Sequence, residues 1–269
     1  MASLQTVQKI GPVLDLFTVA RPEWGVSEVA DNLGLPRSSA HALLSSLVDI
    51  GLLQCRTRGR YRIGWRVVEL NQTLQGTVDV RSSAAPVLQA LSEKYGETTH
   101  LAALERHRVV YLDKVVGHHV INVSGARLGV PMDAHCSAVG KTLLAHCYPD
   151  EIARHVTDKP LRRFTASTVT NPVALSVELK SVLRQGCAFD AGETVAEVHC
   201  VAAPIRDEMG VVVAAMSLTA PASRFVPAQQ EYRRAVIAAA AEVSRSLDTS
   251  GTPAPGTQRD RLSLHAVAG

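Results

Sequence analysis

The chain has 269 residues, enough for two ordinary domains, and its 46% hydrophobic and 20% charged residues are typical of globular proteins. This composition excludes fibrous and generally disordered classes. No stretch approaches the ~18 consecutive apolar residues of a membrane span, and the N-terminus lacks a signal-peptide pattern. Because the five cysteines are scattered, we expect reduced thiols and a cytoplasmic protein.

The net positive charge is concentrated in the first quarter of the chain. Residues 1–66 carry eight Lys/Arg against five Asp/Glu, whereas residues 67–269 carry twenty of each. Four of the eight cations lie within seven residues, at Arg56, Arg58, Arg60 and Arg62. A localised basic patch is typical of a protein that binds a polyanion. On charge alone, an ordinary solvated hairpin is an equally good interpretation.

Three helices are predicted before residue 52. Helical spacing of apolar residues predicts the first over residues 4–20. Ser27 as N-cap and Gly34 just past the end predict a second in the segment SEVADNLG. The third follows a turn at Leu35-Pro36 and ends at Gly51. Its apolar face carries Ala40, Leu43, Leu44, Leu47 and Val48, and its other face carries Arg37, Ser38, Ser39, His41, Ala42, Ser45 and Ser46.

A basic hairpin follows these helices. Residues 52–55 and 61–63 have the pattern of two short strands, with a turn at residues 57–59. A helix-turn-helix followed by such a hairpin is a winged helix, whose polar recognition helix enters the major groove while its wing lies beside the DNA backbone or minor groove. The residues expected to contact DNA are Arg37, Ser38, Ser39, His41, Arg58 and Arg60.

The rest of the chain mixes helices and strands. Helices are expected from 65 to about 75, over 79–95, 137–146, 150–156 and 173–185, and from about 227 to 247. Strand candidates are 98–105, 109–116, 120–124, 199–206 and 211–219. Strand pairs at both ends with helices between them predict an α+β fold. We expect a DNA-binding domain over 1–66, a linker helix over 67–80, a second domain over 81–248 and a disordered tail over 249–269.

Four segments in this order resemble the IclR family of bacterial transcriptional regulators: GLPRSSAHALLSSLVDIGLL, RYRIGWRVVEL, PMDAHCSAVGKTLLA and HCVAAPIRDEMGVVVAAMSLTAP. The resemblance covers about residues 4–247. It implies a winged helix followed by a GAF-like domain that binds a small effector, in a dimer or dimer of dimers on partly palindromic operators. This chain departs from the family in having Ala42 where Arg usually follows the recognition-helix His, and Glu197 where Gly is usual.

The second domain contains a candidate ligand pocket. Alternation along 211–219 places Ser217 and Thr219 on one face of a buried strand, and small residues in 199–205 leave room beside them. On alternation alone, a filled core with satisfied hydroxyls is the better interpretation. The resemblance favours the pocket, because the effector residues that it implies are Ala138, Val139, Asp190, Cys200, Ser217 and Thr219, with apolar walls at Ile121, Met132 and Val198.

Other chemistries are weaker interpretations. Gly140-Lys141-Thr142 resembles the end of a phosphate-binding loop, but that motif needs Gly where His135 stands. We therefore reject nucleotide binding and read Lys141 as a cation at a helix start. A metal held by His135, Asp190 and Cys200 is a minority hypothesis, since no ligand spacing demands it. A GAF-fold enzyme that uses Cys200 with His135 is a second alternative, although buried structural thiols are commoner.

The predicted function is therefore a non-enzymatic, DNA-binding transcriptional regulator without a cofactor or resident metal. One recognition helix covers too few base pairs for useful specificity, so we expect a homodimer or homotetramer on palindromic operator DNA. Hydroxyls and helix N-terminal amides suit a carboxylate. Because Asp190 would repel a second carboxylate, the effector should carry both an acceptor end and a donor end. A small hydroxy or keto acid fits this requirement.

Overall fold

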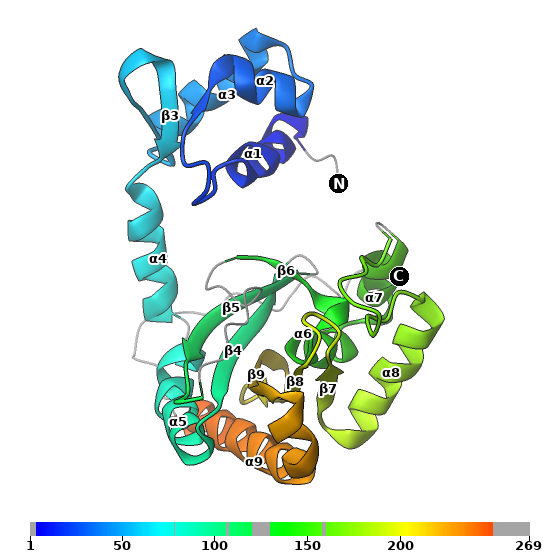
Figure 1. Ribbon diagram of the computed structural model, residues 1–269. Helices are drawn as coiled ribbons and strands as arrows, with labels where there is room; N and C mark the ends of the chain where they lie inside the picture. The colour runs from blue at the N-terminus through cyan, green and yellow to red at the C-terminus, as the bar shows by residue number, and fades with distance from the viewer. Residues whose placement is uncertain (1–3, 78, 106–107, 120–129, 158–159, 250–269) are drawn as a thin grey trace, which may run out of the picture. The chain divides into compact units, whose positions relative to one another are not determined.

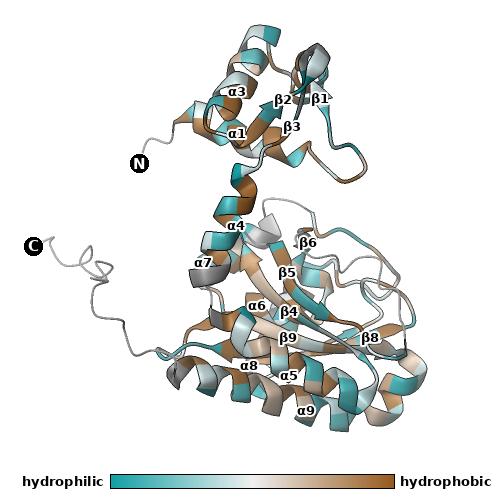
Figure 2. Cartoon of the chain, turned by 90° about the vertical axis from the view of Figure 1, so that its left-hand side faces the viewer, coloured by the Kyte–Doolittle hydropathy of each residue, from teal (hydrophilic) through white to brown (hydrophobic). Residues whose placement is uncertain are grey.

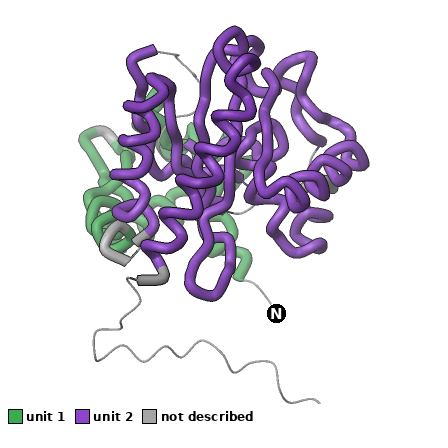
Figure 3. Tube along the Cα trace, turned by 90° about the horizontal axis from the view of Figure 1, so that it is seen from below, with its two compact units in different colours: residues 1–77 green, residues 78–269 purple. Residues whose placement is uncertain are grey.

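The computed structural model describes residues 4–77, 79–105, 108–119, 130–157 and 160–249 (Figure 1). The chain divides into two compact units, Met1–Thr77 and Val78–Gly269 (Figure 3). The division falls inside the stretch 67–80 that the sequence predicts as a linker. The predicted tail lies outside the described residues from position 250 onwards. None of the helices described is long and apolar enough to cross a membrane.

The first unit is a winged helix, as predicted. Its helices are α1 (Gln5–Asp15), α2 (Val26–Leu33), α3 (Arg37–Asp49) and α4 (Arg66–Thr77). Its antiparallel sheet has the order β1-β3-β2, formed by β1 (Trp24–Gly25), β2 (Leu53–Cys55) and β3 (Arg60–Ile63), and the turn η1 (Thr57–Gly59) joins the last two. The sequence pattern missed β1, and α1 ends earlier than the predicted residue 20.

A small apolar core holds this unit together. The apolar face of α3 is buried as expected, and it packs with Val13, Val29, Leu53 and Tyr61. Trp24 closes the core, and its indole Nε1 donates to the carbonyl oxygen of Leu16 over 2.8 Å. The prediction of Ser27 as the N-cap of α2 is wrong, because the N-cap is Gly25, whose amide is held by the Glu28 carboxylate over 2.7 Å.

The second unit is built on a six-stranded antiparallel sheet with the order β6-β5-β4-β9-β8-β7. The strands are β4 (Thr98–Glu105), β5 (Arg108–Val115), β6 (Met132–Asp133), β7 (Ala188–Ala191), β8 (Val198–Arg206) and β9 (Val212–Pro221). The helices are α5 (Asp79–Tyr95), α6 (Ala138–Ala145), α7 (Pro149–Thr157), α8 (Pro172–Gln185) and α9 (Ala222–Thr249), and the turn η2 (Ala134–Cys136) precedes α6.

Each face of this sheet is covered by helices (Figure 1). Leu101, Val201, Met216 and Leu218 point to the face that α5 and α9 cover. The alternate residues, among them Ala102, Ala202 and Ala215, point to the face that α6 covers, and α8 packs against α6. The small residues on this second face leave space between the sheet and α6. The arrangement confirms the α+β prediction.

The short strands β6 and β7 were not predicted. Helix α9 begins at Ala222 rather than near residue 227, and Pro227 lies inside it. Pro227 is the sixth residue of α9, past the first turn, so the helix lacks the hydrogen bond that a backbone N–H there would donate to the Ser223 carbonyl oxygen. The predicted strand 120–124 lies outside the described residues.

Candidate effector cavity and DNA-binding face

A cavity lies between α6 and the small-residue face of the sheet. The cavity is small, with a volume of about 20 Å³, which is about the space that one water molecule needs. Eight residues that the sequence analysis singled out line it: Met132, Ala138, Val139, Asp190, Val198, Cys200, Ser217 and Thr219. The ninth, Ile121, lies outside the described residues. Five lining residues were missed: His100, Tyr111, Ser137, Thr194 and Val195.

Strand register explains why these residues meet. Asp190 on β7 lies opposite Cys200 on β8, which in turn lies opposite Thr219 on β9. Since side chains two residues apart share a face, Ser217 joins them, and its partner on β4 is His100. The row of polar side chains therefore runs across four neighbouring strands.

The N-terminus of α6 forms another wall of the cavity. The Ser137 hydroxyl caps the helix by accepting from the Gly140 amide over 3.1 Å. The amides of Ala138 and Val139, the first two residues of the helix, have no acceptor within α6. Gly140 is required by packing rather than by phosphate binding, because a Cβ atom there would lie 2.1 Å from the carbonyl oxygen of Ala134.

Asp190 is the acidic group of the cavity. Its side chain is buried and accepts a hydrogen bond from the Glu193 amide over 2.6 Å. Burial, with a further contribution from the charge of Glu193, raises the pKa of Asp190 to about 7. Asp190 is therefore able to present either a proton donor or a carboxylate to a ligand near neutral pH.

A chain of hydrogen bonds links the thiol to an imidazole. The Thr219 hydroxyl donates to the Cys200 Sγ over 3.2 Å, and it lies 3.4 Å from the Nδ1 atom of His100. Burial, reinforced by Asp190, raises the pKa of the Cys200 thiol well above its usual range. Cys200 is therefore a neutral thiol, which is a poor nucleophile.

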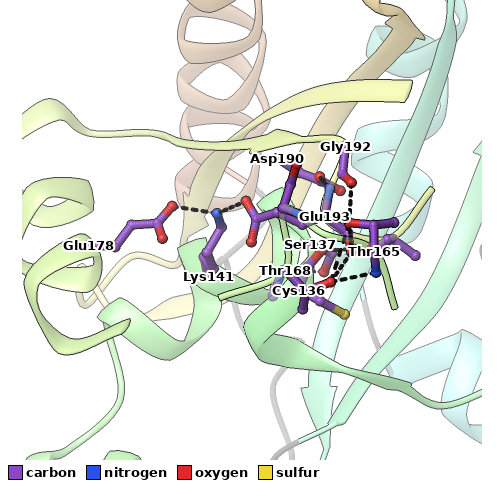
Figure 4. A network of polar contacts seen from close by, with 12 residues as sticks. Cys136, Ser137, Lys141, Thr165, Thr168, Glu178, Asp190, Gly192 and Glu193 are labelled. Carbon is purple, nitrogen blue, oxygen red and sulfur yellow. Dashed lines mark hydrogen bonds and ion pairs between the residues drawn. The ribbon is translucent and has the colours of Figure 1, made fainter. Parts of the chain in front are cut away.

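The turn that holds Asp190 also carries one end of a buried ion-pair network (Figure 4). Lys141 lies in the first turn of α6, as predicted, but it is completely buried, and its Nζ atom contacts the carboxylates of Glu178 and Glu193. Burial opposes the charge on Lys141, but Glu193 and Glu178 raise its pKa above the ordinary value. The network thus connects α6, α8 and the turn after β7.

The threonine-rich stretch is tied to the same turn. The Thr165 hydroxyl donates to the carbonyl oxygen of Gly192 over 2.7 Å, and that of Thr168 donates to Glu193 over 2.6 Å (Figure 4). Glu193 is therefore held at three groups: Thr168 donates to its carbonyl oxygen, its amide donates to Asp190, and its carboxylate pairs with Lys141. These contacts fix the turn that positions Asp190.

The metal and enzyme hypotheses gain no support from the cavity. His135 is not among the lining residues, and its Nε2 atom lies 2.9 Å from the carbonyl oxygen of Arg162. Within the described part of the chain, no three His, Cys, Asp or Glu side chains are grouped as metal ligands would be.

Glu197, where the family usually has glycine, has a left-handed backbone conformation with φ of 63°. It is the only non-glycine residue with positive φ among those described. Its carbonyl oxygen accepts from the Ala222 amide over 2.7 Å, which holds the start of α9. Glu197 thus keeps the backbone conformation that favours glycine, and this conformation is strained for a residue with a side chain.

The recognition helix α3 presents its polar face to solvent. Arg37, Ser38 and His41 are exposed, and Ser39 is half-buried. On the wing, the side chain of Arg58 lies outside the described residues. The guanidinium of Arg60 donates to the Glu28 carboxylate over 2.6 Å and to the Glu23 carbonyl over 2.9 Å. It joins β3 to the start of α2.

A winged helix joined to a domain with a cavity partly lined by polar side chains indicates a class: transcriptional regulators that bind DNA and a small ligand in separate domains. Family models agree with this class. The model of the IclR helix-turn-helix domain matches residues 6–56, and that of the bacterial transcriptional regulator IclR C-terminal domain matches residues 72–245. The chain belongs to the IclR family of bacterial transcriptional regulators, and its second unit contains the family's effector-binding domain.

Individual relatives support the assignment over nearly the full chain. The HTH-type transcriptional regulator XynR of Escherichia coli is 32% identical over 92% of this chain and 98% of its own. The transcriptional repressor IclR of the same species is 30% identical over 81% of each chain. An IclR homologue from Microbacterium hydrocarbonoxydans, crystallised with 4-hydroxybenzoate, is 31% identical, covers 91% of this chain and 99% of its own, and has a TM-score of 0.74.

Proposed function

We propose that a small organic acid binds in the cavity and changes the affinity of the winged helix for operator DNA. The observation that carries this proposal is the convergence of Asp190, Cys200, Ser217 and Thr219 on one cavity beside the N-terminal amides of α6. Donors suited to a carboxylate are the Ser217 hydroxyl, the Cys200 thiol and the amides of α6, and Asp190 is able to donate when protonated. A relative crystallised with 4-hydroxybenzoate gives the same chemical class.

The experiment is operator binding with a panel of hydroxy and keto acids, read by fluorescence anisotropy on the DNA upstream of the protein's own gene. At least one acid should shift the affinity for that DNA. Ser217→Ala should remove the shift and leave basal DNA binding intact, whereas Ser181→Ala, on α8 and outside the cavity, should keep it. A Ser217→Ala protein that responds like the wild type would contradict the proposed cavity.

We further propose that α3 reads the operator through Arg37, Ser38, Ser39 and His41, while Arg58 contacts the DNA backbone. Arg60 was included in the prediction, but its ion pair with Glu28 makes it a poor test, because its removal would disturb the domain itself. Arg58→Ala should weaken binding to all sequences and lower the log-log salt slope by about one. His41→Ala should instead change which sequences bind.

The control for Arg58→Ala is Arg184→Ala, an exposed cation on α8 in the other unit. It should leave both affinity and salt slope unchanged. An Arg58→Ala protein with wild-type affinity and salt slope would exclude the wing contact.

We propose a homodimer or homotetramer. Helix α4 carries a row of exposed apolar side chains at helical spacing, Val67, Leu70 and Leu74, and Trp65 just before the helix is also exposed. Figure 2 shows hydrophobic bands along this helix. Burying such a row against a second copy removes apolar surface from water. Pairing two winged helices would also supply the two half-site contacts that a palindromic operator offers.

We propose that the domain senses its ligand without converting it, and that the protein acts in the cytoplasm, where operator DNA lies. A cysteine nucleophile needs an adjacent base or a lowered pKa. The Cys200 thiol has a raised pKa, and its hydrogen-bond partner is the Thr219 hydroxyl rather than His135. The relatives are described as transcriptional regulators, in agreement with this proposal.

A further inference from the structure

Glu28, in the first turn of α2, connects three parts of the winged helix. Its Oε2 atom accepts from the Gly25 amide over 2.7 Å and from the Arg60 guanidinium over 2.6 Å, and its Oε1 atom accepts from Arg21 over 2.6 Å. Arg21 belongs to the segment before β1, and Arg60 is the first residue of β3. One carboxylate therefore joins that segment, the start of α2 and the base of the wing.

Both arginines of this network are held by a second contact. The guanidinium of Arg60 also donates to the carbonyl oxygen of Glu23 over 2.9 Å. The guanidinium of Arg21 lies 3.5 Å from the centroid of the ring of Trp24, which is buried in the core of the unit. A planar guanidinium that makes two directed contacts has a well-defined orientation. The two arginines therefore fix the position of the Glu28 carboxylate as well as its charge.

The backbone attachment of the wing beside this network is short. Strand β1 pairs with β3 at two positions, Trp24 with Tyr61 and Gly25 with Arg60. Arg60 belongs to the pair nearer to the turn η1, and its carbonyl oxygen accepts from the Arg56 amide across the hairpin over 2.6 Å. The Glu28 network thus lies at the point where the wing leaves its pairing with β1.

Stability alone does not account for these ion pairs. The side chains of Glu28, Arg21 and Arg60 are 38%, 47% and 38% exposed, and ion pairs at exposed positions contribute little to stability. The hydrogen bond from the Gly25 amide, with the charges of Arg60 and Arg21, lowers the pKa of Glu28, so the carboxylate is ionised at neutral pH. A negative charge on the DNA-binding unit weakens its attraction to phosphates. The geometry of the network offers a compensating role.

We propose that Glu28 is a positioning residue for DNA recognition, because through Arg60 it fixes the wing relative to the recognition helix α3, which packs against α2. This inference rests on the proposed DNA-binding function. The recognition helix reads base edges while the wing contacts the backbone, so both engage one operator only when their separation is fixed. Sequence preference should therefore depend on Glu28 more strongly than overall affinity does.

The test measures, by fluorescence anisotropy, the affinity of the full chain for two duplexes: the DNA upstream of the protein's own gene and a scrambled sequence of the same length and composition. Because Glu28→Ala removes a negative charge, electrostatics alone predicts tighter binding to both duplexes. The positioning role predicts that the preference for the upstream duplex falls about tenfold, as for one mismatched base pair, whereas the affinity for the scrambled duplex does not fall. A Glu28→Ala protein with the wild-type preference would overturn the proposal.

The charge-matched control is Asp31→Ala, which removes an exposed carboxylate from the same helix. It should raise the affinity for both duplexes by the same factor and keep the wild-type preference. If Asp31→Ala loses the preference to the same extent as Glu28→Ala, charge rather than position determines the preference, and the proposal is wrong.

A second variant distinguishes positioning from a direct phosphate contact. Arg60→Lys retains the positive charge, but one ammonium group does not reproduce the two directed contacts of the guanidinium with Glu28 and the Glu23 carbonyl. Its log-log salt slope should equal that of the wild type, and its preference should fall as in Glu28→Ala. An Arg60→Lys protein with the full preference would also overturn the proposal, because lysine replaces arginine well only where a point charge is sufficient.

The same titrations separate this inference from the proposed function. If the wild type and both network variants prefer the upstream duplex equally, the inference fails and sequence reading by α3 stands. If the wild type binds the two duplexes equally, both fail.

Discussion

Asp190 is buried and shares its turn with a second carboxylate, Glu193, so its charged form is disfavoured in the folded protein. Its pKa is about 7, compared with an ordinary value near 4. Between these two values the folded chain holds a proton that the unfolded chain releases, so stability falls as pH rises. The contribution of Asp190 is thus greatest below about pH 4 and has been lost above pH 7.

Asp190→Asn should remove this pH dependence, because the amide stays neutral and its oxygen still accepts from the Glu193 amide. The free energy of unfolding of the variant, relative to the wild type, should increase by about 1–3 kcal/mol between pH 5 and pH 8. Urea unfolding of both proteins at the two pH values measures it. A difference that is the same at both pH values would show that Asp190 is ionised throughout.

At the scale of single residues, most residues that line the cavity were predicted from the sequence. Alternation along one strand separates Ser217 and Thr219 from their apolar neighbours, and the family resemblance supplies Asp190 and Cys200. His100 was missed because its place in the cavity depends on the pairing of β4 with β9, two strands far apart in the sequence. The ion pair of Arg60 was not predicted, because the sequence pattern does not reveal that its acidic partner, Glu28, lies close to it from another element.

Among the elements, α6 is anchored to α8 and to the turn after β7 by one buried cation. Lys141 is surrounded by Glu178 and Glu193, so its removal leaves two carboxylates without their counter-charge. Removing one member of a buried ion pair typically costs 3–5 kcal/mol. We expect Lys141→Met to lower the free energy of unfolding by about 3 kcal/mol, as measured by urea denaturation.

The compensating variant distinguishes lost pairing from lost packing. Replacing Glu178 and Glu193 by Gln in the Lys141→Met background should recover most of the lost stability, because no unpaired charge remains. Lys180→Met, an exposed substitution on α8, should change stability by less than about 0.5 kcal/mol. Failure of the double Gln replacement to recover stability would show that Lys141 acts through its methylene packing.

Element prediction succeeded where periodic or capped segments are long and failed where they are short. Helix α5 and strand β4 have the predicted bounds because their apolar spacing and flanking glycine or turn residues are clear. Strands β1 and β6 have two residues each, too few for any alternation to be visible. For α9, Pro227 suggested a helix start, but the chain is already helical five residues earlier.

On the scale of the whole molecule, the row formed by Val67, Leu70 and Leu74 on α4 is expected to pair with a second copy. Leu70→Glu with Leu74→Glu should shift sedimentation at micromolar concentration toward the monomer and weaken operator binding. The matched control is Asn71→Glu with Gln72→Glu, two exposed polar positions on the same helix. A wild-type protein that sediments as a monomer, yet binds operator tightly, would contradict the oligomer.

We propose that the cavity and the winged helix are coupled through one ligand. Coupling between two binding sites is reciprocal, so an acid that changes operator affinity by some factor must have its own affinity changed by operator DNA by the same factor. The most direct measurement is calorimetric titration of the active acid into the protein alone and into its operator complex. We predict equal factors of about 5- to 150-fold in the two directions. An acid that binds the cavity with the same affinity in both states, or that is consumed in a reaction abolished by Cys200→Ser, would contradict the account.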